Sequence, residues 1–280
     1  MSRYKRDFTE KKKKKWEKEK RGQGTLENYK PWLTAKDVPS VGRKHRVPGN
    51  IVNRAYELFS DLERDAFYIF DFSSNVIDIR EQFPLNRDDT LRISDDLGIE
   101  HPKDPKTQVD IVMTTDFVLT LEDNGEIKEI ARTVKYFEDL ADTRVLEKLE
   151  IERRYWEEKN VDWDIITEKQ INKILVSNID KVRSKYHIER TDLFRDMSEK
   201  SLARIKNDLT YALSGNVVIR NVCDSIDDKH GLEYGSSLSL VKHLIARKCI
   251  CFDIQNRKLD FDTPLELYSG NTRREILKVL

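Results

Sequence analysis

Residues 110–137 carry the pattern of a β-hairpin. The run from Asp110 to Thr120 alternates between apolar and polar positions, as a strand with one buried face does, and residues 127–137 have the pattern of the return strand. Asn124-Gly125 lies between the two runs and is the strongest short-range sequence signal for a hairpin. A two-residue turn at this dipeptide pairs Asp123 with Glu126.

This register decides which side chains share a face of the hairpin. It places Asp116 opposite Thr133 and Thr114 opposite Lys135, and all four side chains point to the same face. Asp116 and Lys135 are then diagonal neighbours, roughly 7–8 Å apart between backbones, which is within reach of a lysine side chain. The opposite face carries apolar side chains, so these four polar groups are not simply the solvent face of a strand.

Apolar periodicity predicts the other elements in the first part of the chain. A spacing of three and four residues indicates helices, and short alternating or continuous apolar runs indicate strands. The expected elements are a helix over 51–72, a strand over 76–79, a short helix ending near 98, a helix over 143–159 and a strand over 163–167. Helix, strand, hairpin, helix and strand in this order predict an α/β fold in which helices flank a mixed sheet.

The second part of the chain is mainly helical. We expect helices over 168–186, 192–213, 216–227 and 236–247, followed by two short alternating runs at 249–254 and 258–261. A final helix followed by a two-stranded wing predicts a winged-helix domain. The sequence thus predicts a basic, flexible tail (1–22), an α/β domain (23–168) that begins with an irregular arm over 23–50, and a winged-helix-like C-terminal domain (169–280).

Charge is unevenly distributed along the 280 residues, whose formal net charge is zero. Residues 1–21 contain eleven Lys or Arg and four Asp or Glu, so this segment carries 11 − 4 = +7 and the remainder −7. Such a segment binds polyanions such as DNA by releasing counterions, and a solvated, disordered terminus is the alternative. The lysines at its centre are Lys11, Lys12, Lys13, Lys14 and Lys15. A second basic edge, on the last expected helix, consists of Lys242, His243, Arg247 and Lys248, and would face DNA, a protein partner or solvent.

Composition excludes several classes of protein. The three cysteines, Cys223, Cys249 and Cys251, are too few and too poorly spaced for a disulfide framework or a zinc site, and they fit a reducing cytoplasm. No apolar run approaches the ~20 residues of a membrane span, and no signal peptide is visible.

Two glutamates interrupt apolar helix faces. Glu63 has Ala66, Phe67 and Phe70 as helical neighbours, so its carboxylate lies in an apolar stripe and needs a cation or hydrogen-bond donors. A metal ion or an internal salt bridge would each supply this. Glu152 interrupts the apolar face of the helix over 143–159 in the same way, although charged neighbours also allow it to lie on a charged surface.

Together, these groups suit metal-assisted cleavage of a phosphodiester. Carboxylate oxygens suit Mg²⁺, which binds through one or two carboxylates plus substrate phosphate, and Mn²⁺ takes similar ligands. A metal polarises the phosphoryl group, and a lysine can position the attacking water or neutralise charge on phosphorus. Glu63, Asp116 and Lys135 are therefore the candidate catalytic residues.

Longer strings make this arrangement more specific. They are Gly22-Gln-Gly24, Pro31-Trp-Leu-Thr34, Val38-Pro-Ser40, Gly42-Arg43 with His45-Arg46, Leu58-Phe-Ser-Asp-Leu-Glu63, Val76-Ile-Asp-Ile-Arg-Glu-Gln-Phe-Pro-Leu85, Thr115-Asp-Phe117, Val134-Lys135 and Leu146-Glu-Lys-Leu-Glu-Ile-Glu-Arg-Arg-Tyr-Trp156. Over residues 20–168 the chain resembles TnsA, the endonuclease subunit of heteromeric cut-and-paste transposases, which has the restriction-endonuclease-like PD-(D/E)xK fold. Beyond residue 168 the resemblance rests on length and on the helix-plus-wing pattern.

The resemblance implies a function and a set of partners. It implies a catalytic triad of Glu63, Asp116 and Lys135 in a Mg²⁺-dependent DNA endonuclease that cuts the 5′ ends of a transposon. It implies three partners: double-stranded DNA at the transposon ends, the DDE transposase TnsB, which acts on the 3′ ends, and the AAA+ ATPase TnsC, which contacts the C-terminal region. A bacterial, cytoplasmic, DNA-associated location follows from the same resemblance.

The resemblance to TnsA also suggests roles for four further residues. Glu152 matches a family acid near the active site, which makes it a candidate metal ligand. Thr133 stands where the broader group has Asp or Glu; its side chain is a poor ligand, and its backbone carbonyl is the candidate ligand in its place. Arg43 and His45 lie in the entry string and are candidate DNA contacts, with a packing role as the alternative for His45.

Two other functions fit the same residues. A stand-alone restriction or repair nuclease would cut DNA without a partner transposase. A non-catalytic DNA-binding or assembly protein would need no metal and would be indifferent to the loss of Glu63.

Overall fold

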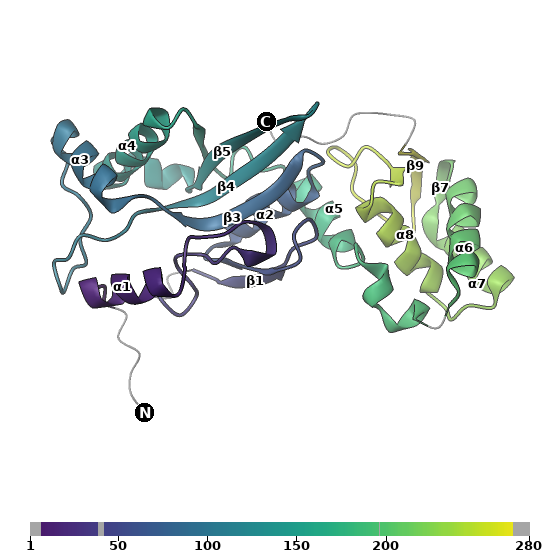
Figure 1. Cartoon of the computed structure of the whole chain (residues 1–280). Coiled ribbons are helices and arrows are strands. Elements are labelled where there is room, and N and C mark those ends of the chain that lie inside the picture. The colour runs from purple at the N-terminus through teal and green to yellow at the C-terminus, as the bar shows by residue number, and fades with distance from the viewer. Residues whose placement is uncertain (1–6, 39–41, 196, 271–280) are drawn as a thin grey trace. The chain divides into compact units, whose positions relative to one another are not determined.

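The computed structural model describes residues 7–38, 42–195 and 197–270 of the chain (Figure 1). It divides into two compact units, one running through Ile171 and the other beginning at Asn172. Residues 1–6 of the expected tail and 271–280 of the expected C-terminal domain lie outside the described residues.

The first unit is built on a four-stranded mixed sheet. Its strands are β3 (Val76–Pro84), β4 (Thr114–Asp123), β5 (Glu126–Val134) and β6 (Asp162–Ile166), hydrogen-bonded in the order β3-β4-β5-β6. β3, β4 and β5 pair antiparallel, and β6 lies parallel to β5. This mixed sheet, with its flanking helices, fits the restriction-endonuclease-like fold.

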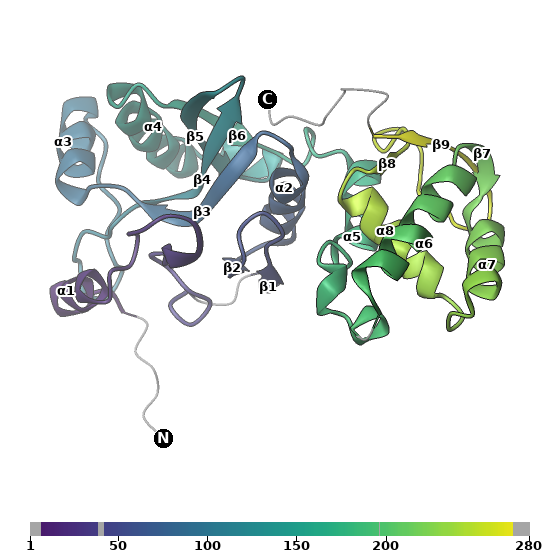
Figure 2. The ribbon, with the colours of Figure 1, turned by 45° about the vertical axis from the view of Figure 1, so that its right-hand side comes forward.

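Helices cover both faces of the sheet. α2 (Asp61–Phe72) and α4 (Thr143–Glu158) lie on opposite sides of it (Figure 2). Phe70 of α2 packs edge-on against Phe117 with ring centroids 5.3 Å apart. The next residue of β4, Val118, points to the other face and is buried with Ala131 and Ile151, together with the C-terminal aromatics of α4. Burial on both faces holds the sheet rigidly where the polar residues emerge.

The predicted hairpin and its register are confirmed. Asp123 pairs with Glu126, and the ladder continues in the same register as far as Phe117 and Arg132. Asn124 and Gly125 have φ angles of 53° and 86°, the left-handed pair that a tight two-residue hairpin turn requires. Both strands lie within the predicted hairpin over 110–137, although β4 ends and β5 begins closer to the turn than predicted. β3 is longer than the predicted 76–79.

The helix predicted over 51–72 is wrong in its first half. Residues 55–58 form β2 (Ala55–Leu58), which pairs with β1 (His45–Pro48) inside the region expected to be an irregular arm. Tyr56 and Leu58 are fully buried, so buried positions alternate along this segment as they do in a strand, and do not follow the spacing of a helix. α2 begins only after Ser60, whose side chain caps the helix by accepting a hydrogen bond from the Glu63 backbone N–H.

The flexible tail predicted over 1–22 is also wrong where the chain is described. Residues 10–18 form α1 (Glu10–Lys18). Its Trp16 is buried against Phe8, Trp32 and Val112, with the Trp16 and Trp32 rings 5.2 Å apart. An apolar anchor among the lysines therefore holds this basic segment on the first unit. The remaining elements of this unit are η1 (Leu26–Asn28), α3 (Arg87–Leu97) and η2 (Phe137–Ala141).

The second unit combines helices with a small antiparallel sheet. In chain order it contains α5 (Lys173–Arg183), η3 (Ile188–Arg190), η4 (Asp192–Phe194), α6 (Glu199–Ala212), β7 (Gly215–Val218), α7 (Ile219–His230), α8 (Ser236–Ala246), β8 (Ile250–Cys251) and β9 (Pro264–Ser269). The sheet has the strand order β7-β9-β8.

The strands of this sheet differ from the prediction. β7 occupies the start of the helix expected over 216–227. In the expected wing, β8 lies within the run over 249–254, and its partner is β9 instead of the run over 258–261. Leu259 in that run is fully buried, and its N–H donates to the Asn178 side chain at 2.7 Å, so a side-chain bond replaces a strand ladder there. The pairing of β7 with β9 joins segments too distant in sequence for a local pattern to connect.

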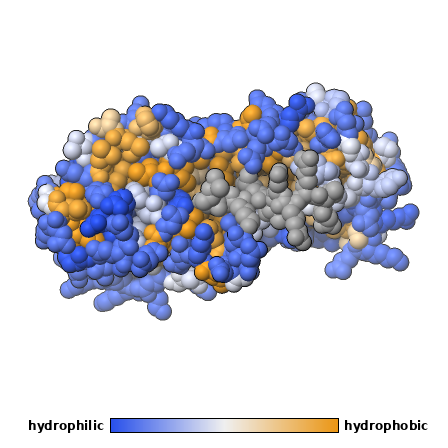
Figure 3. All heavy atoms as spheres, turned by 90° about the horizontal axis from the view of Figure 1, so that it is seen from above, coloured by the Kyte–Doolittle hydropathy of each residue, from blue (hydrophilic) through white to orange (hydrophobic). Residues whose placement is uncertain are grey.

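The expected basic edge of the last helix is not a solvated surface. His243 is buried and contacts the Lys185 and Tyr186 carbonyls, Lys242 is half-buried, and only Arg247 of the four residues is exposed. Over the face seen in Figure 3, hydrophobic and hydrophilic side chains are interspersed. No helix in the described residues is long and apolar enough to cross a bilayer.

Candidate active site

Asp116 stands where the ladder between β4 and β5 ends. Its Oδ2 accepts a hydrogen bond from the Val134 backbone N–H at 2.8 Å, so its carboxylate occupies the place that a carbonyl would fill in a continued ladder. The same oxygen is 3.4 Å from Lys135 Nζ, as the diagonal arrangement predicted. Its Oδ1 accepts a hydrogen bond from the side-chain amide of Gln82, on the neighbouring strand β3, at 3.4 Å. Asp116 is thus fixed from both neighbouring strands.

Lys135 follows directly after β5 and its ammonium group lies among carboxylates. Its backbone N–H donates to the Ile166 carbonyl at 3.0 Å, which ties this residue to β6. Burial alone would lower the pKa of Lys135, but Asp116, Glu152 and Glu63 outweigh it and raise the pKa above its usual value. Lys135 is therefore a protonated cation beside these carboxylates.

Glu63 reaches this site from the first turn of α2. Its carboxylate accepts the Phe59 backbone N–H at 2.9 Å and the Ser60 hydroxyl at 3.2 Å, while the Ser60 side chain caps the Glu63 N–H. This reciprocal capping fixes the side chain at the helix start. Among the described residues Glu63 forms no ion pair, so the structure does not contain the internal salt bridge that was the alternative explanation.

The Glu63 carboxyl is strongly perturbed. Burial and the negative charge of Asp116 raise the pKa of Glu63 to about 8, against an ordinary value of 4.5, and the hydrogen bonds and Lys135 offset this only in part. Two carboxylates pushed together in a low-dielectric site constitute a cation site as much as an acid site. The electrostatics thus bring Glu63, Asp116 and Lys135 into one group.

Glu152 is buried rather than part of a charged surface. Its Oε1 accepts hydrogen bonds from the hydroxyls of Thr115 at 2.6 Å and of Thr133, and from Trp163 Nε1 at 3.1 Å. Burial raises the pKa of Glu152 to about 7 despite these donors. The Thr133 hydroxyl therefore has Glu152 as its hydrogen-bond partner.

The predicted polar neighbours of Asp116 have two different partners. Thr114 donates to the Gln82 side-chain oxygen at 3.3 Å, and the same Gln82 amide donates to Asp116 at 3.4 Å. The Thr133 hydroxyl instead donates to Glu152, which it shares with the Thr115 hydroxyl. Thr114 and Lys135 therefore remain neighbours of Asp116, as predicted, whereas the Thr133 side chain turns to Glu152.

The donor set fits a divalent cation of the magnesium type. Glu63 and Asp116 supply carboxylate oxygens, and Mg²⁺ is often held by one or two carboxylates, with substrate phosphate and water completing its shell. No group of three or more His, Cys, Asp or Glu side chains in the described part of the chain could enclose a metal alone. The site therefore suits an ion whose shell the substrate completes.

The stability of the metal-free protein should fall as pH rises through the window set by Glu63. Between its ordinary pKa of 4.5 and its folded pKa of about 8, the folded protein holds a proton that the unfolded chain has lost. Linkage then makes the free energy of unfolding decrease as pH rises. We expect the melting temperature of chelator-treated protein to fall between about pH 5 and about pH 8, and added Mg²⁺ to raise it most at the upper end.

The variant Glu63→Gln provides the comparison for this measurement. Glu81 and Glu152, whose pKa values burial also raises, give slopes of the same sign, so the measured quantity is the difference between wild type and variant. The variant should show a flatter pH dependence and a smaller response to Mg²⁺. Equal slopes in the two proteins would contradict the assignment.

The residues predicted to bind DNA lie outside this group. His45 Nε2 contacts Asp61 Oδ1 at 2.6 Å, and Arg43 is exposed. The hydrogen bond from His45 is the main cause of a lowered pKa at Asp61, and the charge of Arg43 contributes to it, so both residues lie close to the start of α2. His45 therefore has the packing contact that was its alternative role, and Arg43 keeps an exposed guanidinium.

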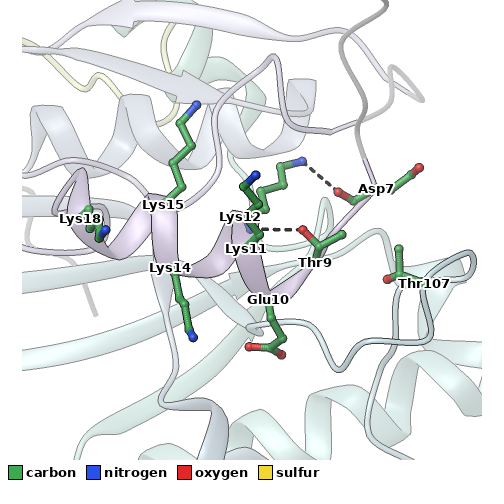
Figure 4. Close-up of a pocket in the computed structure, with 9 residues that line it drawn as sticks. All are labelled: Asp7, Thr9, Glu10, Lys11, Lys12, Lys14, Lys15, Lys18 and Thr107. Atoms are coloured by element: carbon green, nitrogen blue, oxygen red, sulfur yellow. Dashed lines mark hydrogen bonds between the residues drawn. The ribbon is translucent and has the colours of Figure 1, made fainter.

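An open hollow of about 1020 Å³ along α1 is lined by Lys11, Lys12, Lys14, Lys15 and Lys18 (Figure 4). Lys11, Lys14 and Lys15 are exposed on this helix, whereas Lys12 is half-buried over the Trp16 ring, 5.0 Å from its centroid. Lys13 forms an ion pair with Glu17 at 2.6 Å. The five predicted lysines therefore do not present equal positive charge.

Sequence reasoning missed Gln82 as part of this site. It lies in a buried run of β3 whose polar residues are Asp78, Arg80, Glu81 and Gln82. Four such residues in a strand buried on both faces are a signal that the sequence contained, since buried polar groups require partners. The short-strand prediction over 76–79 left Arg80, Glu81 and Gln82 outside the sheet.

Comparisons with known proteins agree with this geometry. Residues 73–168 match the family described as TnsA-like endonuclease N terminal, and residues 170–254 match the family described as TnsA endonuclease C terminal. The chain is also 42% identical over 239 residues to the transposon Tn7 transposition protein TnsA of Escherichia coli, an alignment that covers 85% of this chain and 84% of that protein. Asp116, Lys135 and Glu152 lie inside the first matched range, and Glu63 precedes it.

Proposed function

Because the chain belongs to the TnsA family of transposition endonucleases, we propose that it cuts the 5′ ends of its transposon in a divalent-metal-dependent reaction. The observation that carries this proposal is the convergence of Glu63, Asp116 and Lys135 from α2, β4 and the end of β5. A buried and a half-buried carboxylate beside a protonated lysine provide what phosphodiester hydrolysis needs.

Each of the three side chains has a distinct part in the proposed reaction. Glu63 and Asp116 would hold Mg²⁺, for which Mn²⁺ would substitute, and the ion would supply a Lewis acid for the scissile phosphate. Lys135 would place its ammonium against the phosphoryl oxygens and neutralise the charge that develops on them. Glu152 holds the Thr115 and Thr133 hydroxyls by hydrogen bonds, and we assign it a supporting role rather than direct ligation. The Thr133 carbonyl stays a candidate ligand.

The experiment that tests the function is cleavage of labelled transposon ends. The full-length chain is mixed with the partner DDE transposase of its own element, with Mg²⁺, with Mn²⁺ or with chelator. Cuts at the 5′ ends that require both the metal and the partner support the proposal. Cleavage without the partner favours a stand-alone nuclease, and metal-independent assembly without cleavage favours a non-catalytic binding protein.

The second unit would connect the nuclease to its assembly. The order α6, β7, α7, α8, β8, β9, with β9 between the other two strands, supports a winged-helix-like assignment. We propose that this unit contacts the AAA+ ATPase TnsC, while TnsB shares the transposon ends with the first unit. Most of the α8 residues are buried in the core of this unit, which argues against insertion of this helix into DNA.

We propose that α1 contributes sequence-independent affinity for DNA in the bacterial cytoplasm. Exchanging Lys11, Lys14 and Lys15 for glutamine should reduce the dependence of binding on salt, because each lost phosphate contact lowers the log–log slope by about 0.9. The measurement is fluorescence anisotropy of a labelled duplex at several salt concentrations.

The control replaces three other exposed lysines, Lys128, Lys200 and Lys258, with glutamine. Both triple variants lose the same formal charge, so only the position of the charge differs between them. An identical loss of slope in both variants would show that α1 acts through net charge alone.

A further inference from the structure

Gln82 has a backbone conformation that glutamine rarely adopts. Its φ is 49°, in the left-handed region, although it lies inside strand β3 and is buried. Glu81 pairs with Phe117 and Phe83 with Thr115, so Gln82 faces Asp116 across the β3–β4 ladder. A buried strained residue directly opposite a candidate catalytic carboxylate indicates a functional constraint.

A set of buried contacts holds this conformation. The Trp32 N–H donates to the Gln82 carbonyl at 3.2 Å, which ties the N-terminal arm to this position. At the preceding residue, the Glu81 carboxylate pairs with Arg54 at 2.5 Å and the Glu81 carbonyl accepts the Tyr29 hydroxyl at 3.0 Å. These contacts anchor Gln82 and the residue before it, so the backbone here cannot relax without breaking several buried polar contacts.

The side-chain amide links Asp116 to its strand neighbour. Gln82 Nε2 donates to Asp116 Oδ1 at 3.4 Å, and Gln82 Oε1 accepts the Thr114 hydroxyl at 3.3 Å. The Thr114 bond orients the amide, so its NH₂ group faces the carboxylate rather than its oxygen. Because Oδ2 of Asp116 is already held by Val134 N–H and Lys135, the Gln82 contact fixes the remaining rotation of this carboxylate.

On the basis of the proposed function, we propose that Gln82 is a positioning residue, which holds the Asp116 carboxylate in the orientation that receives the divalent ion. Its strained backbone conformation is what places the amide there. Outer partners of metal-binding carboxylates typically account for about 10–100-fold in metal affinity or activity. This role explains the left-handed backbone of Gln82. Packing alone would not require it, because a residue with ordinary strand angles would pack equally well here.

The test compares two left-handed glutamines. Gln82→Leu removes the amide, and Gln108→Leu makes the same change at an exposed glutamine whose φ is 57°. Binding of Mn²⁺ to the full-length chain is measured by electron paramagnetic resonance, and cleavage is measured as a function of metal concentration. We expect Gln82→Leu to raise both metal midpoints about tenfold or more, with recovery at high metal, and Gln108→Leu to leave both unchanged.

A second variant separates strain from positioning. Gln82→Asn tolerates a left-handed backbone better but its amide is one methylene too short to reach Asp116. It should melt at or above the wild-type temperature and still show the raised metal midpoint. Wild-type metal binding by Gln82→Asn or Gln82→Leu would overturn the inference. Loss of binding in Asp116→Ala alongside normal Gln82 variants would leave the proposed function intact, whereas normal cleavage by Asp116→Ala would remove the function itself.

Discussion

Replacing Asp116 with alanine is expected to abolish cleavage of the transposon ends. Asp116 is the residue on which the other groups of the site converge, since it contacts Lys135 and Val134 and raises the pKa of Glu63. Without it the divalent ion loses a ligand, and several kcal/mol of charge stabilisation correspond to a rate loss of more than about 10³-fold. Cleavage assays with the partner transposase and metal titrations on the same protein measure this result.

Two comparisons make the Asp116 experiment specific. Asp116→Asn keeps the shape and one acceptor oxygen, so it should fold normally and still fail to cleave. Asp139→Ala removes an exposed aspartate a few residues beyond Lys135 and should cleave at the wild-type rate. Removing Asp116 also removes the main charge acting on Glu63, so the pKa of Glu63 should fall. Wild-type cleavage by Asp116→Asn would contradict a ligand role.

Replacing Lys135 with methionine should separate metal binding from catalysis. The ammonium group neutralises developing charge, and losing one such group typically costs about 10²–10³-fold in rate. The variant leaves Glu63 and Asp116 without their nearby cation, so their site becomes more negative and should bind Mn²⁺ at least as tightly as the wild type. Single-turnover cleavage at saturating metal and Mn²⁺ titration measure the two effects.

The matched variant for this experiment is Lys128→Met. Lys128 lies on the same strand β5, near the turn, and is exposed. Its substitution should change neither cleavage nor Mn²⁺ binding. If Lys135→Met lost metal affinity and cleavage in equal proportion, the lysine would be acting on the fold of the site and not on the reacting phosphate.

The threonine at position 133 illustrates how a departure from a motif can be compensated. A carboxylate would be the ordinary residue at this place, and the sequence left it open how threonine serves there. In the structure the Thr133 hydroxyl donates a hydrogen bond to Glu152 of α4. The same carboxylate also accepts hydrogen bonds from the Thr115 hydroxyl and from Trp163 Nε1. An acid buried beside the site is thus supplied by a helix instead of the hairpin.

The interpretation of Glu63 changed most between sequence and structure. Helical spacing correctly placed it among apolar neighbours, but both a metal ion and a salt bridge were consistent with that pattern. The structure shows backbone and hydroxyl donors on one side and the charges of Asp116 and Lys135 on the other. Which explanation applies depends on residues more than fifty positions away, and no periodicity contains that information.

The sequence by itself determined the parts of this protein that rest on local rules. The left-handed turn at Asn124-Gly125 sets the register of β4 and β5, and that register brings Asp116 and Lys135 together because side chains two residues apart share a face. Apolar spacing likewise identified α4 and all of α2, although the predicted helix began before Asp61. These features depend on neighbours within a few residues, so a single sequence is sufficient to predict them.

Only the tertiary structure decided the features that depend on distant partners. Trp16 turns a basic segment into a docked helix because Trp32 and Val112 bury it, and Thr115 meets Glu152 across 37 positions of the chain. Gln82 is held in a left-handed conformation by contacts from Trp32, next to Glu81 and its partner Arg54. Burial and charge from packed neighbours, rather than propensity, fix these positions, and they are the ones that shape the site around Asp116.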